Sequence, residues 1–468
     1  MDNKIIRKDS LLYFKYLLLL IPITIFLWTK ISSIAIYFSD TNVYFYISYL
    51  ILKGKILYKD IWFTNLPLFP YISALYLKLV NGNIYTYLFS GAIEAAIASL
   101  LIFYIVSQKT KNFIFSALSL LLFLFSTVTL SNSTGQAGIF TAVLFLLLAY
   151  ITFEKKKYLS TGILLAACFL TKIYFLPVIL AFFIVTLTTK NIKHFLLLFM
   201  GFLVTNLIIL TPFIIVSGKE MWFDIIQYSL IKKGEFLRSI IIKDFISTDF
   251  ILFIVSIIAL LRVHKDIFFA SAAFFFYLFF FFNKSIFYLY LCMIVPFMSI
   301  YAGYLLTVLQ NKFKLPIMIV PAIICAYVIY TFIHYYNSYL GLDKIDKYNQ
   351  IVSEVNNDKP SYLYGTSFIT TALSYSTGIP LLHESVDTDD ALFITGVLNS
   401  KELTKEAIAR KSDVIVWGRQ YSDGNYIKRE ILNVAIDKEL LYSKCKLANT
   451  YPFRGSYINP LFLFKCRS

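Results

Sequence analysis

Long apolar segments dominate this chain and decide what it can fold into. Hydrophobic residues make up 59% of its 468 residues, and the mean hydropathy is +0.71. Soluble domains are only about 45–50% apolar, and a helix needs about 20 apolar residues to cross a bilayer. The sequence therefore predicts an integral membrane protein with many helical spans.

Eleven segments are apolar enough to be spans or buried parts of a helical bundle. They lie near residues 16–36, 84–107, 113–131, 137–153, 159–171, 173–188, 195–216, 247–261, 267–282, 286–308 and 316–336. The pair 159–171 and 173–188 is short and broken at Thr171-Lys172. Such a break is tolerated only where it lines a cavity or is buried in protein. No cleavable signal peptide is predicted, because the first apolar stretch is too long and lacks a small-residue cleavage site.

Lysine and arginine concentrate in one set of loops. With a cytoplasmic N-terminus, the inner segments are the basic ones, as the positive-inside rule requires: 1–15, 108–112, 154–158, 189–194, 262–266 and 309–315. This pattern predicts a multi-pass plasma-membrane protein whose residues after the last span lie outside the cell. The net charge of +16 would suit nucleic acid, but these loop lysines explain it, so no nucleic-acid partner is predicted.

Residues 337–468 differ from residues 1–336, which we assign to a membrane domain with long outer loops at 37–83 and 217–246. We expect strands at 362–365, 413–418 and 461–465, and helices at 367–377 and 401–411. Helices that alternate with buried strands predict a small soluble α/β domain. Cys445 and Cys466 flank its last two apolar runs. They would form a disulfide if the tail is outside, and two free thiols are the alternative.

Two carboxylates, Asp40 and Asp60, follow the first span in a polar run. An ionisable residue at membrane level is costly and therefore indicates a functional site. A carboxylate there can act as a general base toward a hydroxyl or an amine. The alternative for Asp40 is a helix cap, and Asp60 has the alternative of a loop residue paired with Lys59 or Lys55. Short interfacial helices are expected at 40–53 and 68–77.

The order of several motifs resembles the GT-C glycosyltransferase superfamily, and within it the protein O-mannosyltransferase and aminoarabinose transferase group. The matching parts are Asp40, Gly54 to Asp60, Pro67 to Tyr71, Phe169 to Lys172, and Asn283 to Tyr290 followed by Pro296. The resemblance implies a GT-C-like, polytopic α-helical membrane protein. It would have about 11 transmembrane helices and a small C-terminal soluble α/β domain outside the membrane.

The resemblance also implies transfer of a sugar from a polyprenyl-phosphate donor to an envelope lipid, glycan or protein on the outer face. In an inverting transfer, Asp40 would act as the general base, and Asp60 is the second catalytic candidate. The departing lipid phosphate needs positive charge or hydrogen-bond donors. The substrate-binding candidates are Lys172, Lys284, Tyr288, Lys59 and Arg238, together with Asn65 and Gln136, which replace a basic and an acidic residue of many relatives.

Several alternatives stay open. The basic residues would otherwise contact lipid headgroups, and Gln136 would otherwise cap the start of a helix. No cofactor is predicted, because the four histidines are scattered and no metal cluster or nucleotide motif is evident; a divalent ion stays open. The main alternative function is a non-enzymatic flippase or transporter, which predicts a second broken helix pair that the sequence lacks. A structural membrane subunit is the third.

Overall fold

A computed structural model of the chain describes residues 2–34, 36, 39–189, 191–231, 238–263, 266–283, 286–313, 319–339, 345–384, 386, 390–423, 426–451 and 460–466. The chain forms two compact units. The first, called the helical unit, comprises Met1–Ser33, Phe89–Ile209 and Gly234–Gly341. The second, called the mixed unit, comprises Ile34–Leu88, Leu210–Lys233 and Leu342–Ser468.

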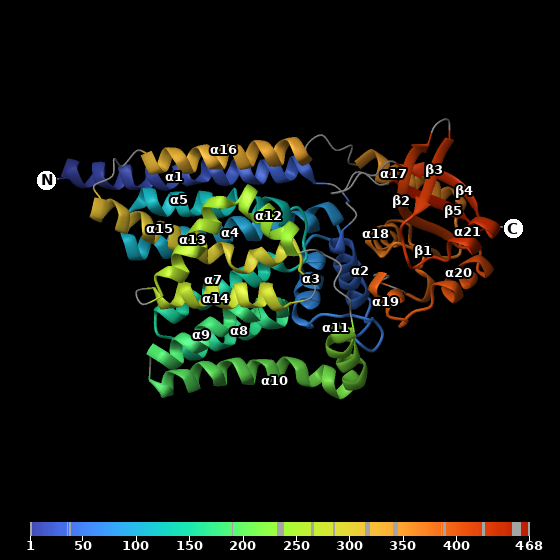
Figure 1. The fold of residues 1–468 in the computed structure, drawn as a ribbon, viewed down its shortest axis with the longest axis horizontal. Helices are drawn as coiled ribbons and strands as arrows, with labels where there is room; N and C mark the ends of the chain where they lie inside the picture. Colours follow the sequence, from blue (N-terminus) through green and yellow to red (C-terminus); the bar gives the residue numbers. More distant parts are fainter. Residues whose placement is uncertain are drawn as a thin grey trace. The chain divides into compact units, whose positions relative to one another are not determined.

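Apolar helices joined by short turns build the helical unit (Figure 1). The elements that lie wholly or mostly in it are α1 (Asp2–Ser33), α4 (Ile84–Thr110), α5 (Phe113–Leu124), α6 (Thr127–Asn132), α7 (Ile139–Glu154), α8 (Tyr158–Thr171), the 3-10 helix η1 (Ile173–Phe175), α9 (Leu176–Thr189), α10 (Ile192–Trp222), α12 (Arg238–Thr248), α13 (Phe250–Leu261), α14 (Ile267–Phe282), the 3-10 helix η3 (Tyr288–Met293), α15 (Val295–Phe313) and α16 (Ile319–Tyr339).

Each apolar segment expected as a span contains a helix, although some are interrupted. The segment 113–131 divides into α5 and α6, and 286–308 begins with η3. Among the described residues, two helices are long and apolar enough to cross a membrane, Ile84–Thr110 and Ile192–Gln227. The pair α12 and α13, bent by 104°, would be a third as one broken span. The count of about eleven spans therefore stays a prediction.

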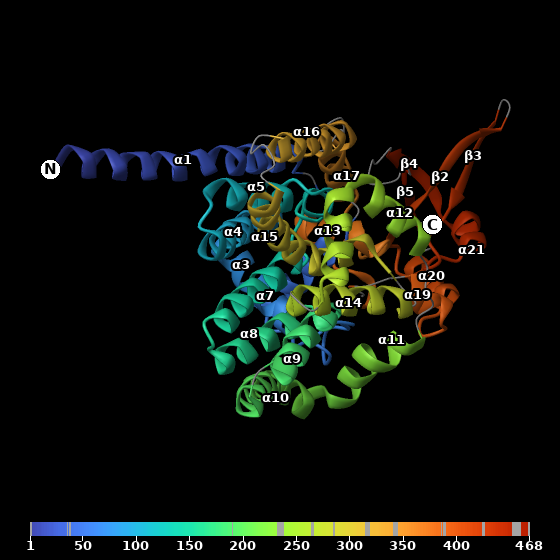
Figure 2. The same ribbon diagram turned by 60° about the vertical axis from the view of Figure 1, so that its left-hand side comes forward.

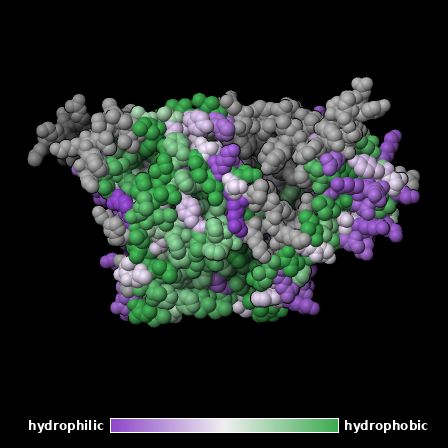
Figure 3. Space-filling model, viewed as in Figure 1, coloured by the Kyte–Doolittle hydropathy of each residue, from purple (hydrophilic) through white to green (hydrophobic). Residues whose placement is uncertain are grey.

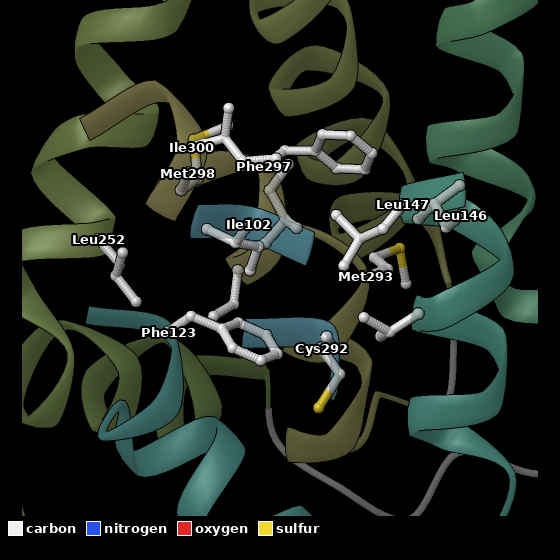
Figure 4. Close-up of a cluster of buried hydrophobic side chains, with 14 of the residues drawn as sticks. Ile102, Phe123, Leu146, Leu147, Leu252, Cys292, Met293, Phe297, Met298 and Ile300 are labelled. Atoms are coloured by element: carbon white, nitrogen blue, oxygen red, sulfur yellow. The ribbon is translucent and has the colours of Figure 1, made fainter. Parts of the chain in front are cut away.

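The helical unit is apolar both inside and outside. Ile102, Phe123 and Phe297 are almost fully buried in its core, which Figure 4 shows in close-up. On its outside, α10 exposes Leu207 and Ile208, and large parts of the surface of this unit are green in Figure 3. An exposed apolar surface of this extent indicates contact with a membrane or another apolar partner.

Shorter helices and a sheet build the mixed unit. Its elements are α2 (Asp40–Leu52), α3 (Leu68–Leu79), the π-helix η2 (Phe223–Gln227), α11 (Tyr228–Ile231), α17 (Ile345–Asp358), β1 (Leu363–Gly365), α18 (Ser367–Thr377), the 3-10 helix η4 (Leu382–Glu384), α19 (Asp390–Ile394), α20 (Ser400–Ala409), β2 (Asp413–Asp423), β3 (Tyr426–Ile431), α21 (Lys438–Lys444), β4 (Lys446–Tyr451) and β5 (Leu461–Lys465).

The sheet has the strand order β1-β2-β5-β4. β1 is parallel to β2, whereas β5 is antiparallel to both β2 and β4. The second half of β2 pairs with β3 as an antiparallel hairpin, which is visible in Figure 2. The strands expected at 362–365, 413–418 and 461–465 and the helices expected at 367–377 and 401–411 are confirmed within a few residues. A disulfide joins Cys445 to Cys466, so the first of the two alternatives for these cysteines is confirmed.

Candidate functional site

Helix α2 begins at Asp40, where the sequence analysis expected a short helix over residues 40–53. Ser39 is its N-cap: the backbone of Ser39 is extended, and its hydroxyl oxygen accepts the Thr41 N–H at 3.2 Å. The capping role that was the alternative for Asp40 is therefore filled by Ser39. Asp40 lies in the first turn of the helix and is exposed, at the end where the helix dipole favours a negative charge.

The loop between α2 and α3 is closed by its own side chains. Asp60 Oδ2 accepts the N–H of Ile56 at 2.9 Å, and the Tyr58 hydroxyl donates to the carbonyl of Asn65 at 2.7 Å. Tyr58 has a φ of 66°, a conformation that is uncommon for residues other than glycine. These contacts give Asp60 the loop-forming role that was its alternative. Its partner is a backbone amide, rather than Lys59, which is exposed.

A buried carboxylate that the sequence analysis did not single out lies beneath this loop. Asp224, in η2, is 2% exposed and accepts the N–H of Phe63 at 3.3 Å. It also hydrogen bonds with the side chain of Trp62, whose ring lies 5.2 Å from that of Tyr228. The second long loop thereby holds the first. Its signal in the sequence was a lone carboxylate in an apolar stretch, Trp222 to Ile226.

In the helical unit, the structure brings two predicted segments together. Lys172 occupies the break between α8 and η1 and is 4% exposed. η1 packs against η3, which begins at Tyr288, and the rings of Tyr174 and Tyr290 lie 4.5 Å apart. Lys284 is outside the described residues. The role of Lys172 in substrate binding stays a prediction.

Two further substrate-binding candidates in the helical unit, Arg238 and Tyr288, form hydrogen bonds with other residues of this unit. Arg238 donates two hydrogen bonds, at 3.1 and 2.7 Å, to the carbonyl of Asn283, the residue before Lys284. The Tyr288 hydroxyl lies 3.3 Å from both Asp249 Oδ2 and the hydroxyl of Thr248. Arg238 thus binds the C-cap residue of α14, and Asp249 lies within hydrogen-bond distance of the Tyr288 hydroxyl.

Asp249 and Lys30 are two buried charges that the sequence analysis missed, and they lie at opposite ends of α6. Asp249 is fully buried and accepts the N–H groups of Thr127 and Val128 at 2.9 and 3.1 Å. Lys30, 2% exposed, donates to the carbonyl of Leu130 near the other end of the helix. Both lie in expected spans, and an ionisable residue there was itself a signal.

Gln136 is engaged in a polar cluster with another missed carboxylate, Glu94 of α4. The Gln136 amide nitrogen donates to Glu94 Oε2 at 2.9 Å and to the hydroxyl of Ser90 at 3.0 Å. Its amide oxygen accepts the N–H of Gly138, the N-cap of α7, at 3.0 Å, and Glu94 Oε1 accepts the Thr141 hydroxyl at 2.7 Å. These contacts match the helix-start role that was the alternative for Gln136.

Metal-binding geometry is not evident in the part of the chain that the structure describes. Within those residues, no group of three or more His, Cys, Asp or Glu side chains could hold a metal ion.

No protein-family model matches the sequence, and no curated protein matches it at a significant level. Solved structures are similar in fold. ArnT from Cupriavidus metallidurans bound to undecaprenyl phosphate superimposes with a TM-score of 0.63 at 11% identity, over 96% of this chain and 97% of that one. The apo state of the same protein gives a TM-score of 0.62 at 12% identity, with the same coverage.

A second kind of enzyme has a similar fold. The Archaeoglobus fulgidus oligosaccharyltransferase, in complex with Zn and sulfate, gives a TM-score of 0.54 at 12% identity, over 90% of this chain and 74% of that one. The chain therefore has the fold that ArnT and this oligosaccharyltransferase share.

Proposed function

We propose that this protein is a membrane glycosyltransferase that moves a sugar from a polyprenyl-phosphate donor to an acceptor on the outer face of the cell membrane. The observation that carries the proposal is the fold likeness to ArnT over 96% of this chain and 97% of that one, since the ArnT structure holds undecaprenyl phosphate. The order of polar motifs around Asp40 supports it independently. The acceptor would be an envelope lipid, glycan or protein.

The proposed architecture follows the sequence. Residues 1–336 form a membrane domain of about eleven spans, and residues 337–468 form an extracytoplasmic α/β domain. The N-terminus lies in the cytoplasm, because basic residues concentrate in the loops on that side. The disulfide between Cys445 and Cys466 supports this orientation, since disulfides persist mainly in oxidising compartments.

The proposed chemistry is a direct displacement with inversion. A hydroxyl or amine of the acceptor attacks the anomeric carbon, and the bond from that carbon to the phosphate oxygen breaks. The bonding electron pair leaves with the polyprenyl phosphate, and the acceptor proton passes to Asp40. The exposed position of Asp40 in the first turn of α2 supports it as the base, whereas Asp60 closes a loop.

Cationic groups would stabilise the charge that develops on the leaving phosphate. We assign this role to Lys172 and Lys284, with Tyr288 as a hydrogen-bond donor and Arg238 as the residue that holds the Lys284 segment. Lys172 supports the assignment by its burial at a helix break. Lys59 and Asn65 would contact the donor from the loop after α2.

A transfer assay with the purified full chain tests the proposal. The donors are undecaprenyl phosphates that carry a radiolabelled hexose, pentose or aminopentose, and the acceptor is an envelope extract. Each reaction is run with EDTA, with Mg²⁺ and with Zn²⁺. Asp40→Asn is compared with Asp60→Asn and with a control that removes an exposed carboxylate on α12, Asp244→Asn.

We expect label to enter the extract with the wild type and kcat to fall about 10²- to 10⁴-fold in Asp40→Asn, the usual contribution of a general base. Asp244→Asn should retain wild-type turnover. Equal turnover in Asp40→Asn and the wild type would contradict the role of Asp40, and a loss confined to Asp60→Asn would move that role there. Translocation of the labelled lipid across vesicles without any transfer would establish the carrier alternative instead.

A further inference from the structure

The C-terminal part of the mixed unit contacts the helix that carries Asp40. Asn42, two residues after Asp40, is 1% exposed. Its side-chain amide donates to the carbonyl of Phe368, in the first turn of α18, at 2.5 Å. A buried amide that lost this acceptor would be costly, so this bond fixes the first turn of α2 against the first turn of α18.

The contact continues along both helices. The hydroxyls of Tyr46 and Ser374 are joined at 3.0 Å. The Tyr375 ring lies edge-on to Phe45 at 4.6 Å and to Tyr49 at 5.1 Å. Early residues of α2 meet early residues of α18, and later ones meet later ones, so the two helices run in the same direction.

Tyr375 also binds the turn that follows α3. Its hydroxyl donates to the carbonyl of Gly82 at 2.7 Å. Gly82 has a φ of +75°, and a Cβ atom there would lie 2.4 Å from the Tyr375 hydroxyl oxygen. Glycine is favoured at this position, because it adopts positive φ at no cost and leaves room for the tyrosine. α18 therefore holds α2 and the end of the α3 segment together.

A further buried polar attachment of α2 within the mixed unit lies in its second half. Ser48 donates to Ser73 of α3 at 2.6 Å. Ser48 and Asn42 are both buried polar side chains of α2, but of the two only Asn42 shares the first turn with Asp40 and is bonded to α18. Comparing substitutions at these two residues therefore separates an effect on the position of Asp40 from a general loss of α2 stability.

We propose that the C-terminal α/β region positions the catalytic carboxylate, with Asn42 as the positioning residue that transmits the hold of α18 to Asp40. This inference rests on the proposed function of Asp40 as the base. A carboxylate on a helix moves with the helix, and a displacement of about 1 Å at a catalytic group costs on the order of 100-fold in rate. The α/β region thus acts on the reaction through α2 rather than through a group of its own.

The test compares Asn42→Ala, Ser374→Ala and the control Ser48→Ala in the full chain. Hydrogen–deuterium exchange of the amides of residues 39–46 measures how often the first half of α2 opens, and this measurement needs no substrate. We expect exchange there to rise about 5- to 10-fold in Asn42→Ala and less in Ser374→Ala. In Ser48→Ala, the increase should fall on residues 47–52.

Turnover in the transfer assay then links the hold to the chemistry. We expect kcat to fall about 10- to 100-fold in Asn42→Ala with the donor KM within about twofold, because the defect lies in the placement of the base. Ser48→Ala should stay within about threefold of the wild type. Unchanged exchange at 39–46 in Asn42→Ala, or equal kcat losses in Asn42→Ala and Ser48→Ala, would overturn the inference.

The two proposals fail in different ways. If the wild type transfers no label from any donor, the proposed function fails, while the exchange measurement still decides whether α18 holds α2. If Asn42→Ala does not fold, Ser374→Ala serves the same comparison, because it loosens the second contact between the same helices and leaves the Asn42 bond in place.

Discussion

Charged side chains have different surroundings in the helical unit and in the α/β region of the mixed unit, residues 345–466. In the helical unit, Asp249, Lys30 and Glu94 are at most 4% exposed. Their contacts include backbone groups, hydroxyls, an amide and aromatic rings. Around Glu354 in the α/β region, opposite charges meet directly where α17 meets Lys465 of β5, at partly exposed side chains.

The difference follows from the surroundings. A buried charge must be offset by fixed dipoles or by an opposite charge, because water cannot solvate it. The peptide groups of α6 supply such dipoles, positive toward Asp249 and negative toward Lys30. Around Glu354, water reaches the partly exposed charges and screens them, so each ion pair contributes little by itself. We therefore expect charge removal to cost most in the helical unit.

The largest effect should come from breaking the charge arrangement around α6. Lys30→Met removes the ammonium that donates to the Leu130 carbonyl and to the Tyr335 hydroxyl. Asp249→Asn removes the negative charge that accepts the N–H groups at the start of α6. Each change should lower the free energy of unfolding by about 2–4 kcal/mol. The double variant should lose less than the sum, since it removes both charges. Chemical unfolding in detergent measures all four proteins, and additive losses would show that the two charges act independently.

The disulfide should have the next largest effect. Its cysteines are 21 residues apart, so the chain-entropy account gives about 3 kcal/mol for the cross-link. Cys445→Ser together with Cys466→Ser should destabilise the α/β region by roughly that amount. Limited proteolysis that distinguishes the two regions would measure it. Equal loss of protection in the helical unit would show that the two regions do not unfold separately.

A smaller, pH-dependent effect is expected at Glu354. Burial acts to raise the pKa of Glu354, but hydrogen bonds from Tyr451, Asn449 and Lys465 outweigh it, so the pKa lies below its ordinary value of 4.5. A carboxylate with a lowered pKa stabilises the fold above its unfolded pKa, and this stability is lost as the pH falls through the folded value. Glu354→Gln should lower the free energy of unfolding by about 1 kcal/mol at pH 7. In this variant the free energy of unfolding should also fall less steeply as the pH drops below 4.5. Unfolding curves from pH 2 to 8 would show whether that slope disappears.

Lys465, in the same network, makes stability depend on pH in the alkaline range. Burial acts to lower the pKa of Lys465, but its hydrogen bonds with Asp358 and Glu354 outweigh this and raise the pKa above 10.5. The stability that this lysine contributes is therefore present at neutral pH and is lost only as the pH rises through the folded value. A loss of stability between pH 7 and 9 that disappears in Lys465→Met would contradict this assignment.

The smallest effect is expected at the ion pair between Lys55 and Glu384. Its atoms lie 3.0 Å apart, and the two side chains are 40% and 46% exposed. Glu384→Gln should change the free energy of unfolding by less than about 1 kcal/mol, and high salt should remove the difference. A larger, salt-resistant loss would erase the contrast drawn between buried and exposed charges.

Local sequence patterns predicted much of the α/β region. The run at 461–465 is apolar and became the buried strand β5, and the helix at 367–377 became α18. α17 was missed although Tyr348, Ile351 and Val355 recur at helical spacing and are buried. β4 was missed because it is an edge strand with mostly exposed side chains, which gives no clear period of two.

The candidate site was predictable only where one segment carries the signal. The position of Asp40 at the start of a helix follows from its neighbours. The bond from Asn42 to Phe368 joins residues 326 positions apart, and no local pattern encodes such a pair. Lys30 and Asp249 could have been singled out as charges in apolar segments. That they lie at the two ends of α6 depends on how the helices pack.

The hydrogen bond between Asn42 and Phe368 also has a consequence for biosynthesis, because its two partners are synthesised at different times. A growing chain lengthens by about 5–20 residues per second, and 326 positions separate the two partners. α2 is therefore synthesised roughly 15–65 s before the helix that contacts it. Throughout that interval the side chains that α18 later covers, such as Phe45, still lack it. Until α18 is synthesised, these apolar side chains add to the transiently exposed surface that makes a folding chain prone to aggregation.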